Sequence, residues 1–174
     1  MGKVKLDFLY NYQLKLRLFF IIFFLVALDQ ISKFLIINNL ETNQSENIFN
    51  LLSFTFVKNY GVAFSFLNNE SFNMSTWIAL LVFLICIILF LYIFTSAFKE
   101  KFSVVEYFAF SLILAGGLGN FIDRVTYGFV IDFIDISFNP YIFNLADSYV
   151  TIGILIYIIK SLFFNKENES HKIS

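Results

Sequence analysis

Two aspartates, Asp132 and Asp147, bracket a short connection between segments apolar enough to enter a membrane. An ionised carboxylate at membrane depth costs roughly 3 kcal/mol, so such residues are typically functional or paired. Two carboxyl groups within a few ångström of each other share one proton. The ionised carboxylate can then take a proton from an attacking water, while the protonated one hydrogen-bonds the developing oxyanion. This pair is the candidate for peptide-bond hydrolysis.

A stripe of small and polar residues precedes Asp132. Gly116, Asn120 and Asp123 follow at i, i+4 and i+7 of a helical pattern, with Arg124 one step further. Small residues let membrane helices approach closely, and polar residues hydrogen-bond across the contact. Asn120 and Arg124 would then support the carboxyl pair. The alternative is that Asp123 and Arg124 are ordinary charges at the membrane edge that cap the helix.

A second polar stripe surrounds Asp147, because Asn144, Asp147 and Thr151 follow at i, i+3 and i+7. An aspartate at this place could simply cap a helix N-terminus. The proximity of a second carboxylate, Asp132, favours the chemical interpretation.

A third group of polar residues lies in the first apolar segment. Asp29 and Lys33 are four residues apart and can pair on one helix face. The pair is interpreted mainly as a salt bridge that holds the outer end of the helix. Ser32 beside Lys33 raises a Ser–Lys protease as an alternative, but adjacent helical residues do not face each other.

Long apolar elements must position these residues. The chain is 59% hydrophobic and 21% aromatic, with a mean hydropathy of +0.76, values outside the range of ordinary soluble domains. Four segments are long enough to span a membrane, and Leu52 to Val57 alternate as in a short strand. We therefore predict an all-α polytopic membrane protein, one domain over residues 1–174, with a small extracytoplasmic β element. The predicted spans are about 18–36, 76–98, 102–122 and 142–164, and the predicted outer loops are about 38–75 and 123–141.

Charged residues predict the orientation of these spans. The net charge is −1, so no basic surface indicates a nucleic-acid partner. Three basic residues, Lys33, Lys58 and Arg124, fall on the outer side. By the positive-inside rule both termini are cytoplasmic, because most other basic residues lie on the opposite side, at Lys3, Lys5, Lys15, Arg17, Lys99, Lys101, Lys160, Lys166 and Lys172.

Two residue types that often carry chemistry are nearly absent. Cys86 is the single cysteine and lies in the middle of a predicted span, so it indicates a packed thiol. His171 is the single histidine and lies in a polar tail. We therefore expect no disulfide, no histidine catalysis, no metal site and no cofactor.

Five sequence blocks, in this order, carry a resemblance to a known family. The chain resembles the lipoprotein signal peptidases (signal peptidase II), bacterial membrane aspartic proteases. The blocks are Asp29-Gln-Ile-Ser-Lys33, Asn59-Tyr-Gly-Val-Ala-Phe64, Gly116-Gly-Leu-Gly-Asn-Phe-Ile-Asp-Arg124, Gly128-Phe-Val-Ile-Asp-Phe133 and Phe143-Asn-Leu-Ala-Asp147.

The resemblance implies a set of roles for these residues. Asp132 and Asp147 would be the catalytic pair, and a small sheet from the first outer loop would lie on the membrane surface beside them. Residues that bind substrate or support the site would be Asn59, Gly116, Asn120, Asp123, Arg124, Asn144, Asp29 and Lys33.

The resemblance also implies a substrate and a location. The substrate would be a prolipoprotein whose cysteine carries a diacylglyceryl group, cut on the amino side of that cysteine. The site would face the outer leaflet of the bacterial cytoplasmic (inner) membrane, in contact with membrane lipid. Globomycin, a cyclic lipopeptide, would inhibit the enzyme from the same groove.

Two other function classes stay open at this point. In a proton-coupled transporter or channel subunit, Asp29, Asp123 and Asp147 would form a relay, although transporter sites lie near mid-span and these acids cluster at the outer ends. A non-enzymatic assembly factor packing through Gly116, Gly117 and Gly119 would have no use for Asp132.

Overall fold

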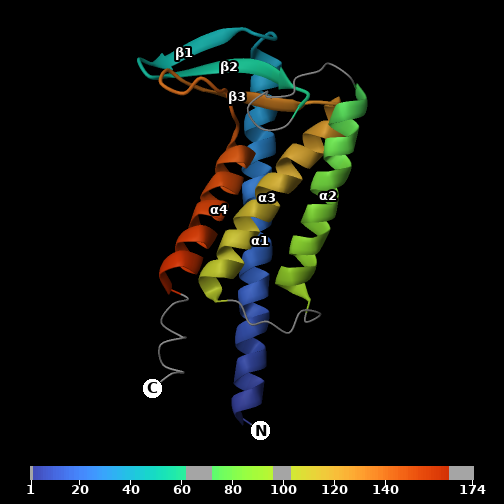
Figure 1. The fold of residues 1–174 in the computed structure, drawn as a ribbon, viewed down its shortest axis with the longest axis vertical. Helices are drawn as coiled ribbons and strands as arrows, with labels where there is room; N and C mark the ends of the chain where they lie inside the picture. Colours follow the sequence, from blue (N-terminus) through green and yellow to red (C-terminus); the bar gives the residue numbers. More distant parts are fainter. Residues whose placement is uncertain (1, 62–71, 96–102, 165–174) are drawn as a thin grey trace.

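Four long helices form the body of the protein. The computed structural model describes residues 2–61, 72–95 and 103–164. Within them the helices are α1 (Gly2–Asn39), α2 (Phe72–Phe94), α3 (Val104–Tyr127) and α4 (Leu145–Phe164). Each contains a segment long and apolar enough to cross a membrane. Figure 1 shows them side by side, with the N-terminal end of α1 and the last turn of α4 toward the same end of the bundle. The predicted polytopic helical fold is confirmed.

The predicted span ends were wrong in several places. Helix α1 extends beyond 18–36 at both ends, and α2 begins four residues before 76. Helix α3 runs to Tyr127, beyond the predicted end at 122, because Gly128 closes it in a left-handed conformation (φ 80°) and donates its N–H to the Arg124 carbonyl. Helix α4 begins three residues after the predicted start, at Leu145. The predicted positions 96–98 and 102 lie outside the described residues.

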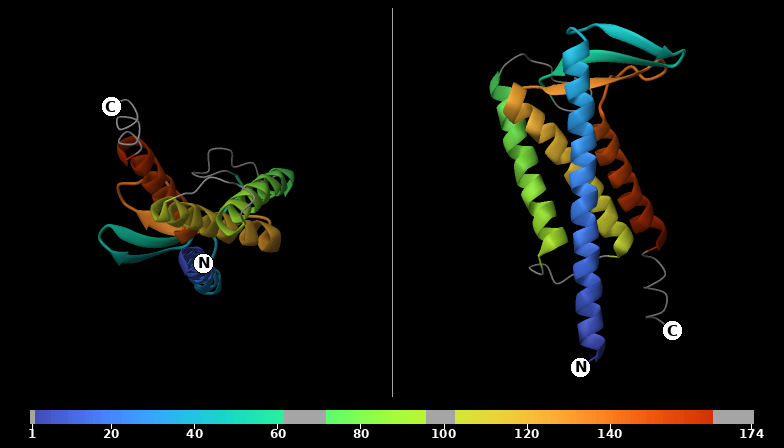
Figure 2. Two further views of the ribbon diagram at one scale, coloured as in Figure 1. Left: turned by 90° about the horizontal axis from the view of Figure 1, so that it is seen from below. Right: turned by 180° about the vertical axis from the view of Figure 1, so that it is seen from behind.

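Helix α3 is the centre of the bundle. It packs against α1, α2 and α4, and the right-hand view of Figure 2 shows α1 crossing in front of it. A side chain at Gly116 would collide with the Ala146 carbonyl oxygen and with Val150 on α4. The small stripe predicted on α3 therefore sets how closely α4 approaches.

Gly116→Ala is expected to lower the free energy of unfolding by about 1–3 kcal/mol, as overpacking of a tight contact does. The Ala146 backbone cannot give way without moving the first turn of α4. Thermal unfolding in detergent measures the effect. Val125→Ala, at an exposed position of the same helix, is the control, and equal stability of the two variants would contradict the prediction.

A small antiparallel sheet lies across one end of the bundle (Figure 1). Its order is β1 (Ser45–Phe49), β2 (Leu52–Asn59) and β3 (Val130–Ile136). The strand expected from the alternation at 52–57 is confirmed as β2. Within the predicted outer loop at about 123–141, residues 123–127 continue α3 and residues 130–136 form β3, a strand that the sequence did not predict. The apolar residues of β3 are buried against β2 and the C-terminal end of α1. The buried residues of this cluster are Ile36, Leu40, Phe56, Ile131 and Phe133.

Candidate active site

Asp132 and Asp147 meet at one asparagine. Asp132 lies on β3 opposite Val57 of β2, and Asp147 lies in the first turn of α4. Asn144 donates its side-chain Nδ2 to Asp132 Oδ1 at 2.7 Å and its backbone N–H to Asp147 Oδ2 at 3.3 Å. The connection that separates the two aspartates in sequence therefore folds back and brings both to Asn144.

The capping interpretation of Asp147 was right in part. The N-cap is Asn144, whose Oδ1 accepts from the Asp147 backbone N–H at 2.9 Å, and Asp147 returns the contact to the Asn144 N–H. This is a reciprocal capping box. Asn144 thus precedes the helix, whereas the sequence pattern placed it within the span. An isolated β-bridge between Phe143 and Ile134 shows that the chain is still extended directly before Asn144.

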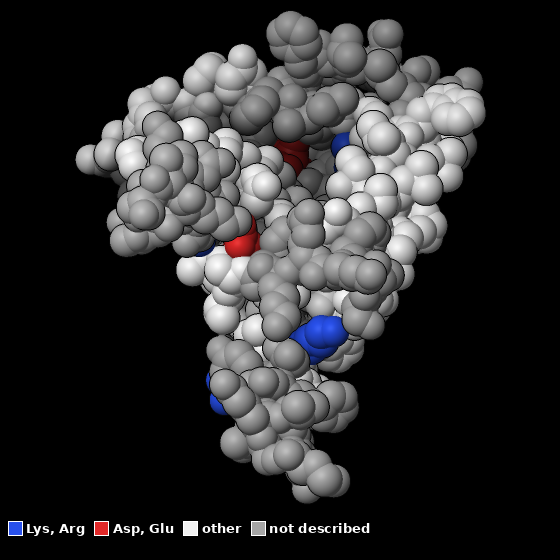
Figure 3. All heavy atoms as spheres, turned by 60° about the horizontal axis from the view of Figure 1, so that its bottom comes forward, with Lys and Arg blue, Asp and Glu red and all other residues white. Residues whose placement is uncertain are grey.

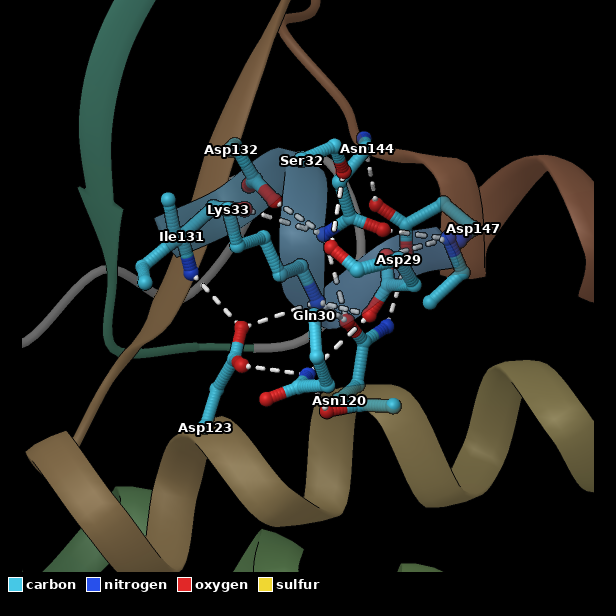
Figure 4. Close-up of polar contacts among 12 residues, drawn as sticks. Asp29, Gln30, Ser32, Lys33, Asn120, Asp123, Ile131, Asp132, Asn144 and Asp147 are labelled. Carbon is cyan, nitrogen blue, oxygen red and sulfur yellow. Dashed lines mark hydrogen bonds and ion pairs between the residues drawn. The ribbon is translucent and has the colours of Figure 1, made fainter. Parts of the chain in front are cut away.

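Two further asparagines complete the hydrogen bonds of the carboxyl pair. Asn59, from β2, donates to Asp132 Oδ2 at 2.9 Å. Asn120, from α3, donates to Asp147 Oδ1 at 2.8 Å and accepts from Asn144 at 3.1 Å. Three elements that are distant in sequence therefore fix the orientation of both carboxyl groups (Figure 4).

Asp132 is placed to hold a proton near neutral pH. The residue is only 2% exposed. Burial, and after it the neighbouring charge of Asp147, raise the pKa of Asp132 to about 7, against hydrogen bonds from Asn59 and Asn144 that lower it. An acid poised at this value can give or take a proton during a reaction.

A buried ionic cluster lies beside the carboxyl pair. Lys33 is 1% exposed and its Nζ lies 2.8 Å from Asp29 and 2.8 Å from Asp123. The expected Asp29–Lys33 pair is present. The alternative that Asp123 is a membrane-edge charge was wrong, because the residue is fully buried against Lys33. Ser32 donates to the Asp29 carbonyl oxygen at 2.7 Å, which leaves the Ser–Lys alternative without a contact to support it.

Arg124 was expected to support the carboxyl pair with hydrogen bonds, but its contacts are to backbone carbonyl groups instead. Its guanidinium donates to the backbone carbonyls of Asn120 (3.2 Å) and Gly61 (2.8 Å). Gly61 follows β2, and its N–H donates to Asn59 Oδ1. Arg124 therefore links α3 to the end of the strand that carries Asn59, and its Nε lacks a hydrogen-bond partner within the described part of the chain.

A cavity of about 720 Å³ opens between α2, α3 and α4 beside Asp147. Asn120 and Arg124 lie at its polar end, and the helices give it long apolar walls lined by Ile78, Val82, Val150 and Ile154. Figure 3 shows acidic and basic atoms recessed in a hollow near the top of the view, while other basic atoms lie at the surface lower down. The cavity suits a ligand that is apolar along the helices and polar at the carboxyl pair.

Sequence reasoning missed Gln30 as a site residue. Its Nε2 lies 3.2 Å from Asp29 Oδ2, 3.0 Å from Asp123 Oδ1 and 3.1 Å from the Gly119 carbonyl oxygen. A side chain at Gly119 would collide with Asp29. No spacing links residues 30 and 119, and only the position of Gln30 next to Asp29 could have pointed to it.

Within the described residues no group of three His, Cys, Asp or Glu is arranged to hold a metal ion.

The fold and the site together define a class: a multi-pass membrane protein that buries a pair of carboxyl groups beside an apolar cavity. A family model described as Signal peptidase (SPase) II matches residues 21–163. The chain belongs to the signal peptidase II family. It is thus a peptidase, and this membership sets aside the transporter and assembly-factor alternatives.

Similar proteins cover nearly the same length. A lipoprotein signal peptidase of Streptococcus agalactiae serotype Ia is 40% identical over 149 residues, 84% of this chain and 92% of the relative. One of Francisella tularensis subsp. novicida is 37% identical over 158 residues, 88% and 96%. A bacterial membrane enzyme solved by the in meso method at 2.3 Å has a TM-score of 0.72 and 34% identity, covering 84% of this chain and 87% of the other.

Proposed function

We propose that the protein is an aspartic endopeptidase that removes signal peptides from prolipoproteins, cutting on the amino side of a cysteine that carries a diacylglyceryl group. The observation that carries the proposal is the convergence of Asp132 and Asp147 on Asn144, beside the apolar cavity. Membership in the signal peptidase II family supports the substrate class. The reaction needs no covalent intermediate with the enzyme.

The two aspartates take different roles. Asp147 lies in the first turn of α4, where the helix dipole favours a negative charge, and it lines the cavity. It is the base. Asp132 lies on β3, away from that helix dipole, and is the acid that holds the shared proton, which its raised pKa of about 7 permits.

The reaction has two steps. Water attacks the scissile carbonyl carbon and gives a proton to Asp147, while Asp132 protonates the carbonyl oxygen, which produces a neutral diol. The C–N bond then breaks as Asp147 passes its proton to the leaving nitrogen. The carbonyl reforms and returns the other proton to Asp132, which restores the starting state.

The membrane would deliver the substrate. The apolar walls of the cavity along α2, α3 and α4 suit the acyl chains and the apolar signal segment. A lipid anchor holds the scissile bond at a fixed depth, so proximity supplies much of the rate. Globomycin, as an amphiphilic cyclic peptide, would compete for the same cavity.

The proposed orientation places both termini in the cytoplasm and the site toward the outer leaflet of the bacterial cytoplasmic (inner) membrane. In Figure 1 the sheet and the start of α4 lie opposite the N-terminal end of α1, and Asp147 is in the first turn of α4. Lys15 and Arg17 lie toward that N-terminal end, which agrees with the positive-inside rule.

The cleavage rate is expected to fall above pH ~7. Asp132 binds its proton below its pKa of about 7 and loses it above that value. Two ionised carboxylates leave no donor for the oxyanion, so kcat should drop about tenfold per pH unit on the alkaline side. Initial rates from about pH 5 to 9, with the folded fraction checked at each pH, measure this. A rate that still rises at pH 8 would argue against Asp132 as the acid.

The experiment that tests the function compares two synthetic lipobox peptides with purified protein in detergent. One carries a diacylglyceryl group on its cysteine and the other carries a free thiol. We expect cleavage of the lipidated peptide only, with product masses that place the cut before the cysteine, and its loss with globomycin. An inert wild-type protein, or a cut at another bond, would overturn the proposal.

A further inference from the structure

Two carboxylates outside the proposed catalytic pair hold the backbone next to it. Asp29 Oδ1 accepts from the Ala146 N–H at 2.9 Å, and Asp123 Oδ2 accepts from the Ile131 N–H at 3.1 Å. Ala146 directly precedes Asp147, and Ile131 directly precedes Asp132. Each carboxylate therefore holds the backbone N–H of the residue that precedes one of the two catalytic aspartates.

One lysine joins these two carboxylates. Lys33 Nζ lies 2.8 Å from Asp29 Oδ2 and 2.8 Å from Asp123 Oδ2, and it donates to Asn120 Oδ1 at 3.0 Å. An ammonium group has three N–H donors, so the three contacts satisfy it. Figure 4 shows Lys33 reaching into the group formed by these residues. In a buried site such a group is costly to break, which makes it a rigid junction.

A second residue, Gln30, also links Asp29 and Asp123. Gln30 Nε2 contacts Asp29 Oδ2 and Asp123 Oδ1, so the two carboxylates are joined both by a cation and by an amide. The hydrogen bonds to Asp132 and Asp147 described above come from β2, α3 and the N-cap of α4. Helix α1 therefore acts on the pair through Asp29 and Asp123, and also through the Lys33 contact to Asn120, which donates to Asp147.

We propose that Lys33 is a positioning residue which sets the relative placement of Asp132 and Asp147 through two arms, Asp29 to Ala146 and Asp123 to Ile131. This inference rests on the proposed function. It assigns Lys33 and the two arms an effect on kcat, because a displacement of about 1 Å in a catalytic group costs about 10²-fold in rate. Substrate binding, which occurs in the cavity between α2, α3 and α4, is left nearly unchanged.

The arm at Asp123 allows a matched test. Asp123→Asn and Asp123→Ala remove the same charge and leave Lys33 paired with Asp29. In the asparagine variant the remaining oxygen can still accept from Lys33 and Ile131, and only the contact from Gln30 to Asp123 Oδ1 is lost, because Gln30 Nε2 stays on Asp29 and the Gly119 carbonyl oxygen. The alanine variant has no acceptor for Ile131. We expect kcat of Asp123→Asn within about tenfold of wild type and kcat of Asp123→Ala about 10²-fold lower, with KM nearly constant in both.

The double variant Lys33→Met with Asp29→Asn tests the junction itself. It removes one positive and one negative charge, so the net charge of the Lys33, Asp29 and Asp123 group stays as in wild type. An asparagine at 29 and the native Asp123 still accept from Ala146 and Ile131, but nothing ties them together at position 33. We expect the variant to fold, with kcat lowered about 10²-fold and KM nearly constant.

The outcomes separate this inference from the proposed function. All variants are assayed on the diacylglyceryl lipobox peptide together with wild type, Asp132→Asn and Asp147→Asn, with rates referred to the folded fraction from thermal unfolding. Equal kcat in the two Asp123 variants, whether high or low, would overturn the positioning role, and so would a double variant with the kcat of wild type. If wild type itself is inert, the proposed function fails and this inference fails with it.

Discussion

Asp132→Asn and Asp147→Asn are each expected to lower cleavage by about 10³-fold or more, because general acid–base catalysis by a positioned group contributes about 10²–10⁴-fold. Asparagine keeps the shape of each side chain and one of its two acceptor oxygens, but it can neither take a proton from water nor protonate the carbonyl oxygen. Cleavage of the lipidated peptide, followed by product mass, measures the loss.

Asp135→Asn is the matched control for this pair of variants. Asp135 lies on β3, three residues after Asp132, and accepts from Thr55 on the neighbouring strand at 2.9 Å. It is only partly buried and lies away from the cavity lining. We expect near wild-type cleavage. If either Asp132→Asn or Asp147→Asn cuts as well as this control, the acid pair is not the catalytic group.

Much of the fold could be predicted because a membrane imposes simple constraints. Apolar length indicated four helices, and alternation at Leu52 to Val57 indicated β2. The strand β3 was missed, because Val130 to Phe133 is a short run buried on both sides and carries no clear period. Its partner is β2, roughly 75 residues earlier, and such a pairing leaves no local signal.

The charged residues show why the helix ends were misplaced. Asp123 and Arg124 appeared to end the third span, since charges are costly in a membrane. Their actual partners, Lys33 and the carbonyl of Gly61, come from other parts of the chain. Once those partners are present, the helix can continue to the glycine that caps it.

The candidate site was easier to predict as a set of residues than as a geometry. Polar residues in an apolar chain stand out, so most members of the network were named from spacing alone. Which atoms meet could not be predicted, because the contacts link α1, α3, β2, β3 and the start of α4. No spacing marks Gln30, which braces the ionic cluster, and none marks the backbone N–H groups of Ile131 and Ala146, which join that cluster to the acid pair.

Asn144→Asp is expected to have the second-largest effect, because Asn144 is satisfied at both ends of its side chain. Its Oδ1 accepts from the Asp147 N–H and its Nδ2 donates to Asp132 and Asn120. An aspartate keeps the helix cap but places an oxygen 2.7 Å from Asp132 Oδ1, where a donor stood. We expect cleavage at neutral pH to fall about 10²-fold or more, and the free energy of unfolding to fall by about 1–3 kcal/mol.

The pH dependence of stability distinguishes this effect from simple loss of packing. A third buried carboxyl group binds a proton more tightly in the folded state than in the unfolded chain, so its folded pKa lies above the unfolded value. The unfolded state then binds fewer protons between the two values, and stability falls as pH rises through that range. The thermal midpoint of Asn144→Asp should therefore approach that of wild type toward about pH 5. Asn144→Ser keeps a good N-cap and adds no charge, but it removes the donor to Asp132, so it should show a smaller recovery. A recovery of equal size in both variants would contradict the argument.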